Sequence, residues 1–211
     1  MAKKELKDLS WAEIAEISRS GKAAEHFEVG DTKTVELFTG EAVELVIVGL
    51  DHDEAQDFKG KAGITFGTKN LLDQMYYMNN EYTNEGGWGK SFMRNVNMPR
   101  IDKLLPQELR EVICPVVKLT QGNGLGDRLF LFSESEVYGT KDDRYRENEQ
   151  YPYFEDSKNR VKVTNSGNDY WWWLRSPLST FTTFFRFVIS NGNLSFNIAS
   201  IAIGLCLGFC V

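Results

Sequence analysis

The stretch GNDYWWWLRSPLSTFTTFFRF, residues 167–187, marks a change in the composition of the chain. Residues 1–177 contain 14 Lys, 18 Glu, 5 Gln, 5 Met and 5 Trp, together 47 of 177 positions, so about nine are expected in residues 178–211. None is present there. Core strands are poor in Lys, Glu and Gln, but Met and Trp favour interiors, so burial alone does not explain the deficit.

The same tail, residues 178–211, is dense in Phe and Ile mixed with Ser, Thr and Asn. Four phenylalanines at 181, 184, 185 and 187 fall within seven positions. Successive strand residues point to opposite faces, so these rings cannot all face the core. The tail therefore predicts an exposed apolar patch, and such patches mark binding surfaces or aggregation hazards.

Length, charge and cysteine content limit the function classes for the 211 residues. With 42% hydrophobic residues the chain can bury a core, and its net charge of -6 offers nothing to nucleic acid or anionic membranes. No apolar run is long enough to cross a membrane, and residues 1–16 do not resemble a secretory signal, so we expect synthesis in the cytoplasm and no membrane insertion. Three cysteines suit a reducing compartment.

Local patterns predict one α+β domain over residues 1–211. Ser10 and Glu13 form a capping box before a helix at residues 10–20 that ends at Gly21, and alternation over residues 33–47 predicts a β-hairpin with a turn at 39–41. We also expect a strand at 63–66, a helix at 106–113, a buried strand at 128–132 and an exposed loop at 141–149.

Motifs spread over the chain resemble the variable proteins of diversity-generating retroelements, in the lectin-like subfamily of gut bacteria and their prophages. In the tail these are WLRSP at 173–177, Phe185, Val188, Gly192, Ala199 and the closing GLCLGFCV at 204–211. Upstream they are LSWAEI at 9–14, VGDTKTV at 29–35, TGEAV at 39–43, GITF at 63–66, GGW at 86–88, SFMR at 91–94 and YPYF at 151–154. The resemblance implies a C-type lectin-like fold of the formylglycine-generating-enzyme type.

The resemblance also implies a cause for the missing residue types. In such systems an error-prone reverse transcriptase randomises adenines, chiefly in Asn codons that end in a pyrimidine, and the copy replaces the 3′ end of the gene. The reachable residues then exclude Lys, Glu, Gln, Met and Trp, the set absent from residues 178–211. Residues 178–211 are therefore expected to be a hypervariable segment within the single domain.

Binding residues commonly sit on loops and strands supported by a rigid scaffold. We expect Trp173, Leu174, Phe185, Val188, Gly192, Ala199, Gly204, Leu205, Leu207 and Phe209 to form that framework. The candidate displayed and varied residues are Leu178, Thr180, Phe181, Phe184, Arg186, Phe187, Ile189, Phe196, Ile198, Ile201 and Ile203. The alternative is that these side chains are ordinary core residues.

The expected function is non-catalytic binding of a variable ligand, as in phage receptor binding or cell-surface display. A Phe, Ile and Leu surface with one Arg favours a protein ligand, because aromatic residues and Arg are typical interface hot spots. Calcium-dependent sugar binding through the tail is disfavoured, since residues 178–211 contain no Asp or Glu. Phage tail or virion proteins are candidate partners, and no cofactor is expected.

Other site chemistries have weaker support in the sequence. Asp51, His52 and Asp53, with Glu54 and Asp57, could ligate a metal, but a polar turn needs the same residues. Cys206 and Cys210 are the only late cysteine pair that could serve a copper-dependent enzyme of the formylglycine-generating type. Their spacing differs from that of the enzymes, so this stays an alternative, as does a structural virion component with a fully buried tail. Trp171–Trp173 could stack on sugars, although core or pocket-wall roles fit better.

Overall fold

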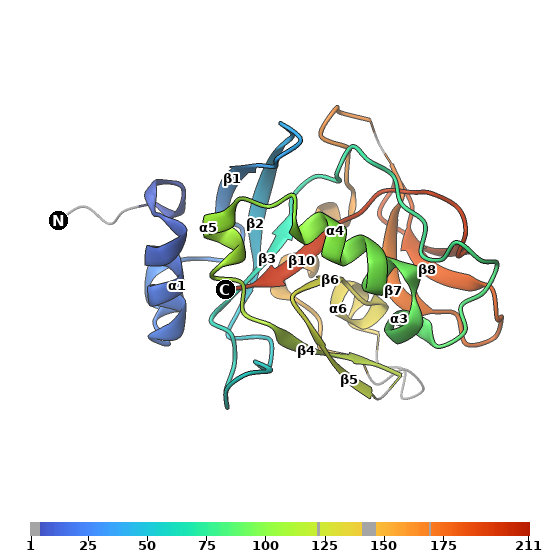
Figure 1. The fold of residues 1–211 in the computed structure, drawn as a ribbon, viewed down its shortest axis with the longest axis horizontal. Helices are drawn as coiled ribbons and strands as arrows, with labels where there is room; N and C mark the ends of the chain where they lie inside the picture. The colour runs from blue at the N-terminus through green and yellow to red at the C-terminus, as the bar shows by residue number, and fades with distance from the viewer. Residues whose placement is uncertain (1–4, 122, 141–146, 169) are drawn as a thin grey trace.

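Three antiparallel sheets carry the fold (Figure 1), and the computed structural model describes residues 5–121, 123–140, 147–168 and 170–211. A five-stranded sheet has the order β1-β2-β3-β10-β6, a second sheet pairs β4 with β5, and a three-stranded sheet has the order β7-β8-β9. The strands are β1 (Thr32–Glu36), β2 (Ala42–Leu50), β3 (Ile64–Thr68), β4 (Val116–Thr120), β5 (Asn123–Asp127), β6 (Leu129–Leu131), β7 (Trp172–Pro177), β8 (Phe184–Val188), β9 (Leu194–Ile198) and β10 (Leu207–Cys210).

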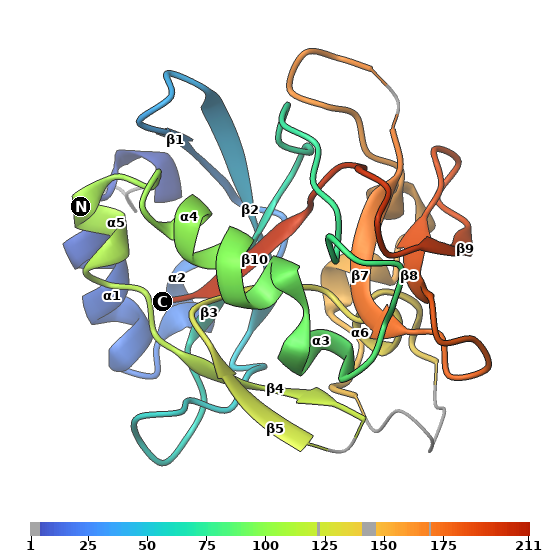
Figure 2. The same ribbon diagram turned by 45° about the vertical axis from the view of Figure 1, so that its right-hand side comes forward.

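The helices are short, and the chain folds as the single α+β domain that the sequence predicts. They are η1 (Leu6–Asp8), α1 (Trp11–Arg19), α2 (Ala23–His26), α3 (Gly87–Lys90), the π-helical turn η2 (Met93–Asn97), α4 (Met98–Asp102), α5 (Gln107–Arg110), α6 (Glu134–Tyr138), η3 (Pro152–Phe154) and η4 (Ser157–Arg160). In both ribbon views α1 lies at the end of the molecule opposite the three-stranded sheet (Figure 2).

The predicted first helix is confirmed in its details. Ser10 accepts a hydrogen bond from the Glu13 backbone N–H, and the Glu13 carboxylate accepts one from the Ser10 N–H. Gly21 follows the helix with φ at 70°, a conformation that glycine adopts without strain. The helix buries Trp11, whose ring meets Phe66 of β3 edge-on at 5.5 Å. This contact fixes α1 on the five-stranded sheet.

The predicted hairpin is also confirmed, with Glu36 paired to Ala42 across the turn. The predicted helix at 106–113 is wrong in length, because only α5 is helical and Cys114 pairs instead with Cys210 of β10. The strand expected at 128–132 is β6. Of the loop expected at 141–149, residues 141–146 lie outside the described residues.

The last strand, β10, is an inner strand of the five-stranded sheet. β10 pairs with β3 on one side and with β6 on the other, and every residue of β10 is buried. The Ser18 hydroxyl donates to the Val211 carbonyl oxygen, which also ties α1 to this strand. The tail after residue 178 therefore first adds β8 and β9 to β7 and then returns to the core as β10.

A buried ion network joins the sheets. Lys118 of β4 donates to Asp53 and lies 3.0 Å from the Glu136 carboxylate in α6. Arg175 of β7 makes an ion pair with the same Glu136, and Nη1 donates to the Leu131 carbonyl oxygen at 2.8 Å. All four charged side chains are fully buried. Two carboxylates thus neutralise two cations inside the core, which buried charges require.

The network controls the pKa values of its members. Burial opposes ionisation of Asp53 and Glu136, but Lys118 beside Asp53 and Arg175 beside Glu136 hold both carboxyl pKa values below their usual range. Burial likewise opposes protonation of Lys118, yet the two carboxylates raise its pKa above the ordinary lysine value. All four groups are therefore charged near neutral pH.

No helix in the described part of the chain is both long and apolar enough to cross a membrane.

Replacing Lys118 with Met should lower the free energy of unfolding by about 3–5 kcal/mol, because Asp53 and Glu136 would lose a buried counter-charge. The matched control is Lys69→Met, which removes an exposed lysine paired with Glu44 and should cost no more than about 1 kcal/mol. Urea denaturation at pH 7 measures both values. Equal losses in the two variants would contradict the role given to the network.

Acid should unfold the protein through the same groups. Because Asp53 and Glu136 have lowered pKa values in the folded state, their contribution is present above the unfolded pKa values of about 3.9 and 4.3 and is lost as the pH falls below them. Urea midpoints measured between pH 7 and pH 3 should drop below about pH 5. A midpoint that stays constant over this range would contradict this expectation.

Candidate ligand-binding surface

The register of β8 and β9 separates the tail residues into two faces. Arg186 pairs with Phe196 and Phe184 with Ile198, so these four side chains share the outer face of the three-stranded sheet. Phe185 and Phe187 alternate with them and point inward, where they are 0% and 3% exposed. The sheet therefore presents one set of side chains and buries the other.

Three phenylalanines form a cluster on the outer face, here called the Phe cluster: Phe181, Phe184 and Phe196. The Phe181 and Phe184 ring centroids lie 5.4 Å apart, and Phe196 lies 5.5 Å from Phe184. Phe181 remains 54% exposed and Phe196 46% exposed. These contacts fall within the range of favourable aromatic pairs, but much apolar ring surface still faces solvent.

Arg186, the one charged residue of the tail, is paired with the framework. Its Nε lies 2.8 Å from Oε2 of Glu134 in α6, an ion pair in which the two atoms are not aligned as a hydrogen bond. The Glu134 carboxylate is largely buried. A ligand that covers the ion pair would therefore remove little further water from this carboxylate. The outer face is thus apolar with its single positive charge neutralised.

The structure places the eleven candidate residues in three environments. Thr180, Phe181 and Phe196 are exposed, and Phe184, Arg186, Ile189, Ile198 and Ile201 are half-buried. Leu178, Phe187 and Ile203 are buried and present no surface to a ligand in this structure. Phe187 faces inward by strand alternation, and Ile203 forms a two-way backbone bridge with Tyr76.

The alternative that the whole tail is core expects all eleven to be buried. Phe181 and Phe196 are close to half exposed, which does not fit that alternative at the Phe cluster. The expected framework residues are all buried: Trp173, Leu174, Phe185, Val188, Gly192, Ala199, Gly204, Leu205, Leu207 and Phe209. Of the three tryptophans, Trp172 and Trp173 are in the core, and Trp171 is 41% exposed.

The acidic cluster after β2 does not converge on a metal site. Asp53 turns into the core to join Lys118, while the His52 ring stacks on Tyr151 with centroids 4.0 Å apart. Within the described ranges, no group of three or more His, Cys, Asp or Glu side chains is arranged to hold a metal ion. Neither interpretation of the sequence, a metal site or a polar turn, predicts the ion pair that Asp53 makes with Lys118.

The late cysteines lie in separate buried environments. Cys206 Sγ contacts the Thr68 carbonyl oxygen, whereas Cys210 Sγ lies 3.5 Å from the Asp53 carboxylate. Burial raises the pKa of both thiols, as does the neighbouring Asp53 for Cys210. Neither side chain reaches solvent in this structure, and a protonated, enclosed thiol is a poor nucleophile or metal ligand.

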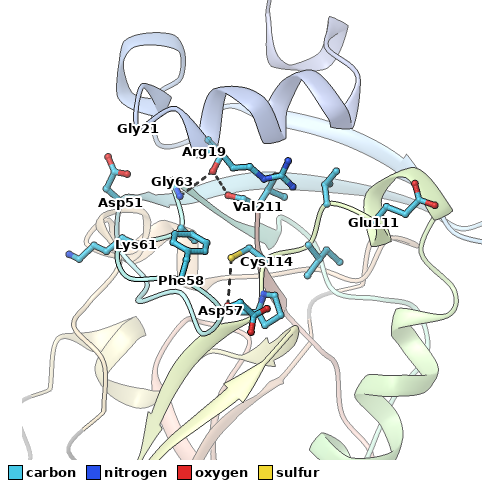
Figure 3. Close-up of a pocket in the computed structure, with 15 residues that line it drawn as sticks. Arg19, Gly21, Asp51, Asp57, Phe58, Lys61, Gly63, Glu111, Cys114 and Val211 are labelled. Carbon is cyan, nitrogen blue, oxygen red and sulfur yellow. Dashed lines mark hydrogen bonds between the residues drawn. The ribbon is translucent and has the colours of Figure 1, made fainter.

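A pocket of about 480 Å³ lies beside the C-terminal end of α1 (Figure 3). Arg19 and Lys61 line it together with Asp51, Asp57 and Glu111, so its charges are mixed. The Cys114 thiol reaches the lining, but burial, reinforced by Asp57, raises its pKa. None of the eleven candidate residues lines this pocket, which belongs to the opposite end of the molecule.

Residues 63–205 match the model of a protein family described as a domain of unknown function, DUF6273. The chain belongs to the DUF6273 family. No curated protein and no solved structure matches it. The DUF6273 match begins just before β3 and ends before β10, so it includes the whole three-stranded sheet and the Phe cluster.

Substitutions in the tail should distinguish the inner and outer faces of the three-stranded sheet in this DUF6273 chain. Phe185→Ala, on the inner face, should lower the free energy of unfolding by about 3–5 kcal/mol through cavity formation. Phe181→Ala and Phe196→Ala, at exposed rings, should each cost less than about 1.5 kcal/mol, the upper range for an aromatic pair. Urea denaturation of the three variants measures the difference. A loss at Phe181 equal to that at Phe185 would place the Phe cluster in the core.

Proposed function

We propose that this chain is a non-catalytic binding protein with a C-type lectin-like fold, whose tail at residues 178–211 is diversified by a retroelement. One observation carries the proposal. The outward-facing Phe184, Arg186, Phe196 and Ile198 of β8 and β9 are candidate varied residues, the buried Phe185 and Val188 are framework residues, and residues 178–211 lack Lys, Glu, Gln, Met and Trp. Phe187 is the exception, because it is a candidate residue that faces inward. A binding surface on a rigid scaffold calls for this division.

The chemistry of the outer face favours an apolar partner, in our proposal a protein. The Phe cluster offers aromatic surface that gains about 25 cal/mol for each Å² removed from water. Arg186 already has Glu134 as its counter-charge, so the face does not demand an anionic ligand. Calcium-dependent sugar recognition through the tail lacks its carboxylates, since residues 178–211 hold no Asp or Glu.

Display on a phage particle or at a cell surface is the setting we propose for this binding. Absence of catalysis is part of the same proposal. The late cysteines that an enzyme of the formylglycine-generating type would use are enclosed in this structure, and their thiol pKa values are raised by burial. This supports a binding role over a copper-dependent one.

The coding DNA tests the proposal position by position. A noncoding repeat of the 3′ end should lie near the gene together with a reverse transcriptase gene. At Phe184, Arg186 and Phe196 the repeat should carry adenines that the gene has lost. At Phe185 the repeat and the gene should agree, because this phenylalanine faces inward in the same strand and is the matched control.

Two results would contradict the proposal. One is a locus with no such repeat and no reverse transcriptase gene. The other is a repeat whose differences fall on Phe185 and Val188 as often as on Phe184 and Arg186, because the buried framework would then vary with the surface.

A further inference from the structure

Asn84 makes four polar contacts with the start of the tail. Its side-chain Nδ2 lies within hydrogen-bond distance of three carbonyl oxygens, those of Leu178 at 3.2 Å, Phe181 at 2.8 Å and Phe184 at 2.7 Å. Its backbone N–H donates to the Thr182 carbonyl oxygen at 2.7 Å. One residue therefore contacts four carbonyl groups between residues 178 and 184, three in the loop between β7 and β8 and one at the first residue of β8.

The position of Asn84 explains this reach. It lies in the loop that leads into α3, and Figure 2 shows that loop running alongside β8. The Gly87 N–H donates to the Asn84 carbonyl oxygen at 2.9 Å, so the helical turn holds Asn84 in place. Because α3 carries the buried Trp88, the clamp is built on the core rather than on the tail.

All four contacts go to the main chain of the loop. The side chains of Thr180, Phe181 and Phe184 take no part in them, so these side chains can change without removing any of the hydrogen bonds. A clamp that used the loop side chains would be broken by each substitution. Every residue has a backbone carbonyl group, so hydrogen bonds to these groups can hold a segment whose side chains vary.

The rest of the tail is held in the same way. The Asn79 N–H donates to the Ala199 carbonyl oxygen at 3.0 Å, and the Tyr138 hydroxyl donates to the Gly192 carbonyl oxygen at 2.8 Å. Tyr76 and Ile203 exchange two backbone hydrogen bonds of 2.9 and 3.0 Å. Each contact joins a residue upstream of 178 to a backbone atom of the tail.

We infer that Asn84 is a positioning residue that fixes the backbone of the loop at residues 178–184 whatever side chains the loop presents. The inference rests on the proposed function for its purpose, since a surface that varies needs a loop that does not. An amide is required because its N–H groups donate to carbonyl oxygens. A carboxylate at the same place has no N–H group, so its oxygen atoms would repel the carbonyl oxygens. A shorter side chain would leave the carbonyl groups without this hydrogen-bond donor.

Amide hydrogen exchange on the full chain tests the clamp. The reporters are the Leu178 N–H, which donates to Phe184, and the Ala199 N–H, which donates to Thr183. In Asn84→Asp we expect both amides to exchange about ten- to a hundredfold faster, because one or two hydrogen bonds to the loop are lost and the new carboxylate repels the carbonyl oxygens. The Ile47 N–H, which donates to Asp31 in the five-stranded sheet, should not change and reports that the protein is folded.

Two matched variants complete the design. Asn95→Asp makes the same chemical change at an amide that donates to the Gly89 and Ser91 carbonyl oxygens, away from the tail, and should leave the Leu178 N–H unchanged. The double variant Phe181→Asn and Phe184→Asn keeps the clamp and changes the displayed side chains. The exchange rate of its Leu178 N–H should stay within about threefold of the rate in the parent chain, because the hydrogen bonds of the clamp are retained.

The inference is overturned if Asn84→Asp leaves the Leu178 exchange rate unchanged, or if the Phe181 and Phe184 double variant accelerates it as much as Asn84→Asp does. Should Asn84→Asp also expose the Ile47 N–H, Asn84→Ser decides in its place by the same two criteria. These outcomes do not depend on any ligand. The clamp can thus fail while the coding DNA still shows diversification, or hold where the DNA shows none.

Discussion

The buried ion network of Asp53, Lys118, Glu136 and Arg175 is the constraint on which the arrangement of the sheets depends. Each charge would be costly in the core without the others, so the chain segments that carry them must meet. Lys118 comes from β4, Glu136 from α6 and Arg175 from β7. Because Arg175 enters the core from the first strand of the three-stranded sheet, the network fixes that sheet relative to the five-stranded one. Arg175 also donates to the Leu131 carbonyl oxygen of β6, the neighbour of β10.

Because the network anchors the sheets, the outward side chains of the tail contribute little to holding the fold together. The inner face supplies Phe185 and Phe187 to the core, Asn84 and Asn79 hold the connecting loops by their carbonyl oxygens, and β10 closes the chain between β3 and β6. What remains on the outer face is the Phe cluster and the Arg186 pair with Glu134. Its apolar rings are exposed at a cost in solubility that a purely structural surface has no reason to carry. The proposed binding role would account for that exposure.

Local signals in the sequence predict the local elements well. The capping box at Ser10 and the alternation around residues 33–47 depend on near neighbours, and both appear in the structure as expected. The Phe-rich run from 181 to 187 also predicts that some rings must face outward, and strand alternation now assigns Phe184 to the outer face and Phe187 to the inner one. The helix expected at 106–113 is shorter, because its last turn gives way to a long-range pairing between Cys114 and Cys210.

Contacts between distant residues could not be predicted in this way. Nothing near Lys118 in the sequence shows that it meets Asp53, 65 positions away, and Asn84 lies in a polar loop like many others until the fold brings it to residues 178–184. The most direct measurement of the central claim is a pair of crystal structures, of the parent chain and of a variant with Phe181, Phe184, Phe196 and Ile198 all replaced by Ser. The account predicts that the backbone of residues 178–204 superposes within about 1 Å, the scatter of pre-organised binding surfaces. A loop at 178–184 that moves away from Asn84 in the variant would contradict it.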